Sequence, residues 1–268
     1  INENKDNPFF LYVPHPMPHV PIAVSEKFLG KSNQGLYGDL MMEIDWSVGR
    51  IINALEKNKI IDNTLTIFTS DNGPWLNFGN HAGSTGGLRE GKGTSFEGGQ
   101  RVPTIMMWPD VIPAGKIANQ LSSAIDILPT VSHIVDGNLP KHKIDGINIM
   151  EILKGEKVNP RKEFYYYYGN NNLEAVRKDN WKLILPHNSR SYKGVLPNND
   201  GFPGNYNSIT TGLELYNLRR DPGEEYDVIK KYPNIAKELA ELAEKARSDM
   251  GDNLTGRKGI NNRNHGKL

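Results

Sequence analysis

The feature that most constrains the fold is a short apolar run that stops abruptly at polar turn residues. Residues 64–70 read Thr-Leu-Thr-Ile-Phe-Thr-Ser, and Asp71-Asn72-Gly73-Pro74 follows directly. Because the run is apolar on both faces and does not alternate, it predicts a buried strand of a parallel sheet. Open α/β sheets bind their ligands beyond the carboxyl ends of such strands, which is where Asp71 and Asn72 would lie.

The Asp-Asn pair has two interpretations. A carboxylate beside an amide oxygen offers hard oxygen ligands that suit Ca²⁺ or Mg²⁺. Asn-Gly and Gly-Pro are also ordinary turn sequences, so the stretch by itself favours a plain turn. The neighbouring sequence has to decide between a metal site and a turn.

The residues around this run predict the later part of an α/β domain over residues 1–158. Residues 9–13 are apolar and predict a further buried strand, which a proline-rich loop follows. Residues 37–57 carry apolar side chains at three- and four-residue spacing, as an amphipathic helix does. Residues 102–108 predict another strand, and residues 123–135 predict a helix. The side chains expected to point inward from that helix are Ile125, Leu128 and Ile134.

Residues 159–268 predict a smaller α+β subdomain with a basic tail. It would hold an antiparallel sheet packed with one amphipathic helix, and the predicted strands are residues 163–168, 174–178, 181–186 and 213–218. The helix is predicted at residues 235–250. Residues 188–211 are rich in Asn and Gly, and we expect an irregular surface loop that could set substrate selectivity. The basic tail, residues 257–267, is expected to be a solvated segment.

Composition excludes several function classes. The formal net charge of +1 at pH 7 creates no strong field that would select nucleic acid or a membrane surface. No apolar run approaches the roughly 20 residues that a membrane span needs. The absence of Cys excludes disulfides and Cys-ligated zinc. We therefore expect no nucleic-acid partner and no membrane span.

Further segments occur in a fixed order around the Asp-Asn pair. Residues 8–21 join an apolar run to a loop that carries two histidines. Residues 86–103 read Gly-Gly-Leu-Arg-Glu-Gly-Lys-Gly-Thr-Ser-Phe-Glu-Gly-Gly-Gln-Arg-Val-Pro, and residues 215–224 read Leu-Tyr-Asn-Leu-Arg-Arg-Asp-Pro-Gly-Glu. Together with the strand that ends in Ser-Asp-Asn-Gly-Pro, they resemble the type I sulfatases of the alkaline phosphatase-like superfamily. The resemblance covers nearly the whole chain, but only the later part of a sulfatase.

The resemblance implies a fold, a metal and a reaction. The fold would be α/β, an alkaline phosphatase-like mixed sheet flanked by helices and present in part, plus a small C-terminal antiparallel sheet with one helix. Asp71 and Asn72 match the late metal ligands of the family. The implied ion is Ca²⁺ rather than Mg²⁺, completed by carboxylates from an N-terminal part. The implied reaction is hydrolysis of sulfate esters, and a sulfated carbohydrate is the expected substrate and partner.

The resemblance also implies roles for other side chains. Lys92 would contact the sulfate oxygens, where a fixed ammonium stabilises developing charge and its glycine neighbours allow close approach. His19 would donate a hydrogen bond to sulfate or protonate the departing alcohol oxygen. Glu97 and Arg101 are expected to hold the loop together. The candidate substrate-binding residues are His15, Trp75, His81 and Arg89.

The nucleophile motif of the family does not occur in these 268 residues. Sulfatases carry Cys-x-Pro-x-Arg or Ser-x-Pro-x-Arg, whose first residue is oxidised to formylglycine, and the chain has no Cys and no Ser-x-Pro-x-Arg. The early strand with paired Asp residues is not found either. We therefore expect formylglycine, derived from Cys or Ser, on an N-terminal part of the same protein. By family resemblance the expected location is periplasmic or extracellular.

Three alternatives stay open at this point. A phosphonate or phosphate-ester hydrolase of the same superfamily shares the fold and the metal chemistry, although the Gly-Lys-Gly-Thr block favours a sulfatase. A non-catalytic homologue could bind sulfated glycans, although the joint presence of Asp71, Asn72, Lys92 and His19 argues against it. A stand-alone structural fragment would leave an unpaired sheet edge, which favours aggregation.

The absence of the nucleophile motif generates a first prediction. The purified 268-residue chain should release no sulfate from sulfated sugars, because it has no residue that can become formylglycine. Ion chromatography of inorganic sulfate would measure this, and turnover by the pure chain would contradict it.

Overall fold

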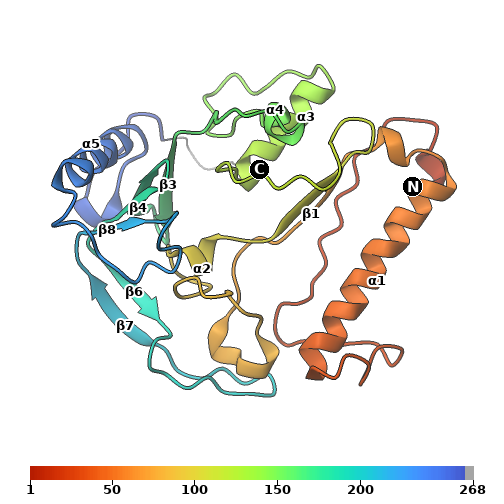
Figure 1. The fold of residues 1–268 in the computed structure, drawn as a ribbon, viewed down its shortest axis with the longest axis horizontal. Coiled ribbons are helices and arrows are strands. Elements are labelled where there is room, and N and C mark those ends of the chain that lie inside the picture. Colours follow the sequence, from red (N-terminus) through yellow and green to blue (C-terminus); the bar gives the residue numbers. More distant parts are fainter. Residues whose placement is uncertain (263–268) are drawn as a thin grey trace.

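The computed structural model describes residues 1–262, and Figure 1 shows a long helix at one end and a helix-covered sheet at the other. Residues 263–267 of the predicted basic tail lie outside the described residues. Helix α1, Gly35–Lys57, confirms the amphipathic pattern. Strands β1, Thr66–Thr69, and β2, Thr104–Met107, confirm two predicted strands. The boundary at residue 158 stays a prediction.

Strands β1 and β2 form a two-stranded antiparallel sheet, with Ile67 opposite Met106. The parallel pairing predicted for residues 64–70 is wrong for the described chain, in which the one partner of β1 runs antiparallel. The apolar character that suggested it has another cause. Two packed layers, one on each face of β1, partly cover the side chains that point to opposite faces of the strand.

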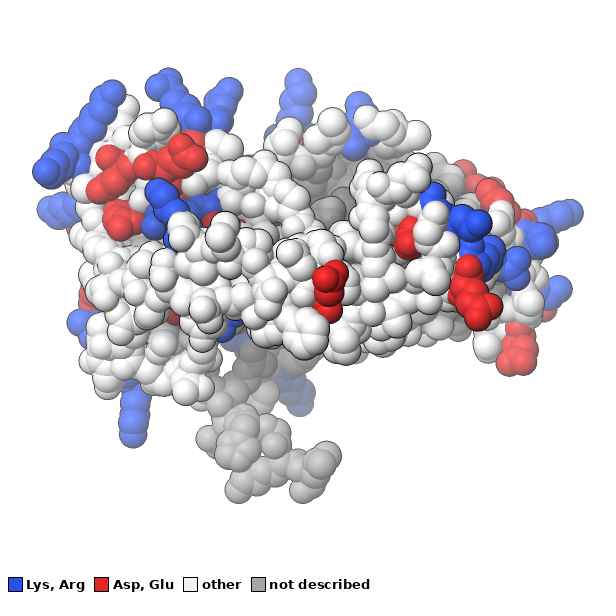
Figure 2. Space-filling view, turned by 90° about the horizontal axis from the view of Figure 1, so that it is seen from below, with Lys and Arg blue, Asp and Glu red and all other residues white. Residues whose placement is uncertain are grey.

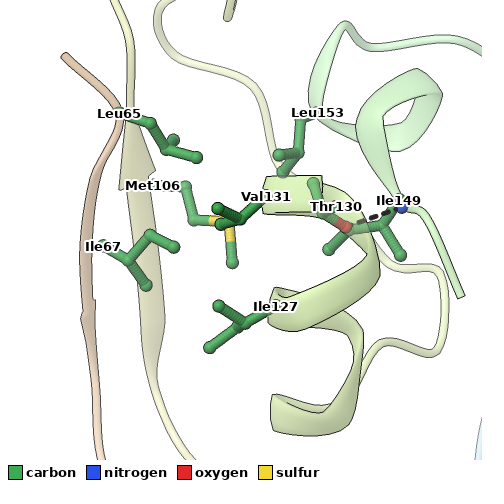
Figure 3. A pocket seen from close by; sticks show the side chains of 8 residues that line it. All are labelled: Leu65, Ile67, Met106, Ile127, Thr130, Val131, Ile149 and Leu153. Atoms are coloured by element: carbon green, nitrogen blue, oxygen red, sulfur yellow. Dashed lines mark hydrogen bonds between the residues drawn. The ribbon is translucent and has the colours of Figure 1, made fainter. Parts of the chain in front are cut away.

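Helix α3, Ile127–Ile134, forms the layer on one face of this sheet. Figure 3 shows side chains of α3 pointing toward those of β1, β2 and the residue before β1, and this apolar layer consists of Leu65, Ile67, Met106, Ile127 and Val131. Thr130 Oγ1 accepts a hydrogen bond from the Ile149 N–H at 3.0 Å, which holds the start of helix α4, Met150–Leu153, beside α3. On the opposite face Phe68 packs against a cluster that includes Leu40 and Ile44 of α1.

The predicted strand at residues 9–13 is wrong. These residues form no strand, and Phe10 and Tyr12 expose 80% and 75% of their surface. The apolar run lacks a strand partner among residues 1–262, so its backbone joins no ladder and its side chains face outward. Apolarity indicated a buried segment but could not supply the neighbour that would bury it.

The interior of the predicted helix at residues 123–135 also differs from expectation. A 3₁₀ turn, Ala124–Asp126, leads into α3, and Ile125 and Leu128 are 45% and 55% exposed instead of inward. Asp126 is the buried residue at this corner. Its carboxylate accepts hydrogen bonds from the backbone N–H groups of Ser123 and Ile147 and from the Arg161 guanidinium. A buried carboxylate needs such partners, and they determine how the helix is rotated.

The second sheet has four antiparallel strands in the order β3-β4-β5-β8. These strands are Glu163–Tyr168, Asn172–Lys178, Trp181–Ile184 and Glu214–Asn217. Helix α5, Pro233–Met250, covers one face, and Tyr165 and Tyr167 of β3 pack into the same cluster. The four strands and the helix confirm the predicted elements. The fully buried core residues beneath α5 include Leu173, Val176, Leu183 and Leu215.

Residues 188–211 are less irregular than predicted. They include most of a hairpin, in which β6, His187–Ser191, pairs with β7, Asn207–Thr211. The Asn- and Gly-rich residues between the strands form the loop that was expected. Figure 1 shows this hairpin below the second sheet and to the lower left of α2, Glu97–Gln100.

A buried charge cluster joins the second sheet to the Gly-rich block. Lys182 of β5 is fully buried, and its Nζ lies 3.1 Å from Oε1 of Glu97 and 2.9 Å from Oε1 of Glu224. It also donates a hydrogen bond to the Ser95 carbonyl at 2.8 Å. Glu97 therefore holds the block in place, as predicted, through Lys182 on β5. Arg101, the other predicted contributor, is exposed.

Burial and charge oppose each other in this cluster. Burial by itself would lower the pKa of the Lys182 ammonium, but the charges of Glu224 and Glu97 outweigh it and raise the pKa. Burial is the largest influence on Glu97 and opposes its ionisation, yet the charges of Lys182 and Arg177 together outweigh burial and lower the pKa of Glu97. Burial raises the pKa of Glu224. The ammonium is therefore the group on which both carboxylates depend.

This dependence can be tested by removing the ammonium. Lys182→Met should lower the free energy of unfolding by about 3–5 kcal/mol, because it leaves the Glu224 carboxylate buried without its counter-charge and Glu97 with only the more distant Arg177, at 3.9 Å. Adding Glu97→Gln and Glu224→Gln to that variant should recover part of the loss. Urea unfolding followed by circular dichroism would measure both changes.

The matched control is Lys178→Met, which removes a partly exposed ion pair with Glu238. It should move the urea midpoint far less, since solvent screens such pairs. Equal effects of Lys178→Met and Lys182→Met would contradict the assignment.

Candidate functional site

The turn after β1 and the Gly-rich block pack backbone against backbone. The Gly73 N–H donates to the Gly99 carbonyl at 3.0 Å, and the Lys92 N–H donates to the Pro74 carbonyl at 2.8 Å. These two bonds place the Asp-Asn pair and Lys92 on adjoining segments. The two sequence motifs are therefore parts of one structural unit.

This close approach explains the glycines of both motifs. A Cβ added at Gly73 would lie 1.8 Å from the Gly98 carbonyl oxygen, and one at Gly98 would lie 2.2 Å from the Glu90 carbonyl oxygen. Both distances are far below contact distance, and the clashing atoms belong to the backbone. Glycine is required here by space, since any side chain would push the segments apart.

Trp75 brings the two predicted catalytic side chains together. Its ring lies 5.9 Å from the His19 ring in an edge-on arrangement, and the Lys92 Nζ lies 5.1 Å from its ring centroid. Phe78 packs against the other part of the indole at 4.8 Å. His19, Trp75 and Lys92 come from three separate segments, so the fold itself assembles this cluster.

The polar atoms of His19 and Lys92 leave binding capacity at this cluster. His19 Nδ1 lies 2.7 Å from the Val20 carbonyl, which can only accept, so Nδ1 carries the proton and Nε2 remains for another partner. The Lys92 ammonium forms no ion pair within residues 1–262, and the indole face stabilises it where it stands. The ammonium of Lys92 and Nε2 of His19 are therefore the two polar groups near Trp75 that an anion could contact.

The predicted metal ligands follow β1 directly. The Asp71 carboxylate is exposed and makes no hydrogen bond or ion pair with any described residue. Asn72 donates from Nδ2 to the Gly73 carbonyl at 2.9 Å, which leaves Oδ1 as an oxygen donor. Both donors suit Ca²⁺, which takes 6–8 oxygen ligands. The part of the chain that the structure describes holds no cluster of three or more metal-ligating side chains, so these two are an incomplete set.

Two of the predicted substrate-binding residues contact the protein elsewhere. His15 Nε2 lies 2.9 Å from Ser47 Oγ on α1. The Arg89 guanidinium lies 3.8 Å from the Phe96 ring centroid, donates to the Tyr216 hydroxyl at 3.0 Å and pairs with Glu214 at 3.4 Å. These contacts tie the block to β8, and the predicted substrate contact of Arg89 stays a prediction.

His81 lies at the contact between two loops. It ends a 3₁₀ segment, Leu76–His81, that packs against the loop between β6 and β7, where a Cβ on Gly201 would lie 3.6 Å from His81 Nδ1. Within that contact Asn77 donates to the Gly204 carbonyl at 2.7 Å. The structure therefore places His81 beside Gly201, and its predicted substrate contact stays a prediction.

The hairpin contributes residues that sequence reasoning did not single out. The Tyr192 hydroxyl donates to the Lys92 carbonyl at 2.7 Å, and the Glu90 carboxylate accepts from Ser191 Oγ at 2.6 Å and from the Tyr192 N–H at 2.7 Å. Burial raises the pKa of the Tyr192 hydroxyl, which keeps it a donor. The only sequence signal was the position of these residues in the segment expected to set selectivity.

The charge distribution on one face of the molecule is shown in Figure 2. Lys, Arg, Asp and Glu side chains gather toward the two ends of this face, and its middle is mostly uncharged. No broad basic surface is visible there. Among the described helices, none has the length and apolarity needed to cross a membrane.

Comparison with known proteins decides the family. The family model Sulfatase matches residues 1–137, and the model for the C-terminal region of aryl-sulfatase matches residues 159–265. The chain belongs to the sulfatase family. It is 35% identical over 240 residues to human arylsulfatase D, covering 84% of this chain and 40% of that protein.

Two bacterial comparisons extend this result to the fold. The chain is 33% identical over 261 residues to N-acetylgalactosamine-6-O-sulfatase from Bacteroides thetaiotaomicron, covering 92% of the chain and 49% of that sulfatase. It also superposes, with a TM-score of 0.74 and 32% identity, on a structure from work on glycosaminoglycan metabolism by Bacteroides thetaiotaomicron, over 92% of the chain and 52% of that structure. The predicted alkaline phosphatase-like fold is thereby confirmed. The chain spans about half the length of these bacterial relatives.

The crowded glycines of this sulfatase site generate a prediction. Gly98→Ala should lower the free energy of unfolding by about 1–3 kcal/mol, because the methyl group meets a backbone carbonyl. Thermal unfolding would measure the change.

Gly49→Ala is the matched control, since a Cβ there meets nothing within 4 Å and Gly49 lies inside α1. Alanine should stabilise that helix position by about 0.5–1 kcal/mol. A change of the same sign in the free energy of unfolding for Gly98→Ala and Gly49→Ala would contradict this explanation.

Proposed function

We propose that the protein hydrolyses sulfate esters of a carbohydrate. The observation that carries the proposal is the convergence of Lys92 and His19 on Trp75, next to the oxygen donors of Asp71 and Asn72. One cation, one imidazole and a partial hard-metal site suit a tetrahedral oxyanion bonded to an alcohol oxygen. Family membership supports sulfate as that oxyanion.

Asp71 and Asn72 would hold Ca²⁺ together with ligands from outside these 268 residues. Ca²⁺, when bound, supplies positive charge to the sulfate oxygens, and formylglycine outside this chain supplies the nucleophile. Lys92 would bind a sulfate oxygen and stabilise the charge that develops as the ester bond breaks. His19 keeps Nδ1–H on the Val20 carbonyl, so Nε2, when protonated, would give its proton to the departing alcohol oxygen. Trp75 would hold both side chains and exclude water from one side.

The substrate class rests on the relatives. One is named an N-acetylgalactosamine-6-O-sulfatase, and a similar structure comes from work on glycosaminoglycans. We propose a sulfated carbohydrate or polysaccharide, with part of the Trp75 ring available to the sugar. Such a substrate favours a periplasmic or extracellular location. The nucleophile motif would separate this proposal from a phosphonate or phosphate-ester hydrolase and from a glycan-binding homologue.

Lys92 offers the direct test. In a polypeptide that joins this chain to its nucleophile-bearing part, Lys92→Ala should lower kcat/KM for a sulfated sugar by about 10²–10³-fold, as loss of one charge-stabilising group does. Lys157→Ala, at an exposed position, is the control and should change nothing. Sulfate release is the readout, and circular dichroism checks folding.

Two further measurements complete this experiment. Chelation of Ca²⁺ should abolish activity, and added Ca²⁺ should restore it. Faster turnover of phosphate or phosphonate esters than of sulfate esters would overturn the proposal in favour of the alternative hydrolase. Binding of sulfated sugars without any turnover would favour the glycan-binding homologue.

A further inference from the structure

Arg190 of β6 lies against the residue that follows Lys92. A Cβ added at Gly93 would lie 3.0 Å from Nη1 of Arg190 and 3.2 Å from its Cζ. Gly93 also has a φ of +92°, a conformation that side chains disfavour. Glycine at 93 therefore lets a guanidinium from the hairpin approach the backbone beside the proposed sulfate-binding lysine.

Two tyrosines hold this guanidinium in place. Arg190 Nη1 donates to the Tyr192 hydroxyl at 3.3 Å, and its Cζ lies 4.2 Å from the Tyr206 ring centroid. Tyr192 in turn donates to the Lys92 carbonyl at 2.7 Å. One tyrosine thus contacts both cationic residues, and the position of Arg190 is coupled to that of the Lys92 loop.

Within residues 1–262, no carboxylate forms an ion pair with Lys92 or Arg190. The nearby carboxylate of Glu90 accepts hydrogen bonds from Ser191 and from the Tyr192 backbone instead. Arg190 has five N–H donors, and its contacts with Tyr192 and Tyr206 leave donors and the positive charge for an external oxyanion.

We propose that Arg190 binds a second anionic group of the substrate, beside the sulfate ester that Lys92 contacts. The group would be a carboxylate or a second sulfate, because a guanidinium binds both through paired N–H donors. This inference rests on the proposed sulfatase function. It makes the β6–β7 hairpin, which Figure 1 shows beside α2, a determinant of substrate selectivity.

The test compares three substrates of increasing charge. The first is a monosulfated N-acetylgalactosamine, the second carries an additional sulfate on the same sugar, and the third carries a neighbouring uronic acid. They are given to the polypeptide that includes the nucleophile-bearing part, as wild type and as Arg190→Gln. At least one doubly anionic substrate should show a KM at least tenfold higher in the variant, with kcat little changed. The monosulfated sugar should stay within about twofold, and the affected substrate identifies the anion.

Two further variants separate charge from folding. Lys193→Gln removes an exposed cation from the same hairpin and should leave all three KM values unchanged. Arg190→Lys keeps the charge but loses the planar fork, so it should restore only part of the affinity. Unchanged melting temperatures would show that each variant folds.

The outcomes separate a failure of the Arg190 proposal from a failure of the proposed sulfatase function. If Arg190→Gln raises KM equally for all three substrates, or for none, the second-anion role is overturned while the sulfatase function stands. If the unsubstituted protein hydrolyses no sulfated sugar, the proposed function fails, and the Arg190 role fails with it.

Discussion

A lysine without solvent contact holds the candidate site against the second sheet. Lys182 reaches from β5 to Glu97 at the start of α2 and to Glu224 in the turn after β8. Replacing Lys182 by a neutral residue would leave the carboxylates of Glu97 and Glu224 buried away from water. Because Glu97 lies in the Gly-rich block, the position of Lys92 depends on a strand nearly a hundred residues away.

Dependence on residues far away in the sequence also explains which elements could be predicted from the sequence and which could not. Hydrophobic periodicity correctly predicted α1, α5 and the strands of the second sheet, because the spacing of apolar residues within an element shows which of its faces packs against neighbours. Which strands pair, and in which direction, could not be predicted from periodicity. The apolar residues 64–70 suggested a parallel strand, and the structure instead packs Ile67 against α3 and Phe68 against the α1 cluster, with both side chains partly buried. Residues 9–13 carry the same signal and stay exposed.

The arginines show the same limit at the site. Arg89 lies inside the most recognisable motif and was predicted to contact substrate, and the structure shows its guanidinium in contact with Phe96, Tyr216 and Glu214. Arg190 lies in an Asn- and Gly-rich segment without a motif, yet it stands beside Gly93. The partners of a guanidinium are set by tertiary contacts, so spacing along the chain could not tell these two apart. Resemblance did supply Lys92 and His19, whose shared neighbour Trp75 only the structure reveals.

The hydrogen bond from Tyr192 to the Lys92 carbonyl has a consequence for how selectivity can change between relatives. If the β6–β7 hairpin were exchanged between two such proteins, the incoming hairpin would have to carry its own tyrosine. Otherwise the loop that carries Lys92 would lose this hydrogen bond when the specificity changes. Changes in length are therefore best tolerated beyond Tyr192, between the strands of the hairpin. Natural variation in ligand choice should concentrate there, while the base of the hairpin keeps its register with the loop that carries Lys92.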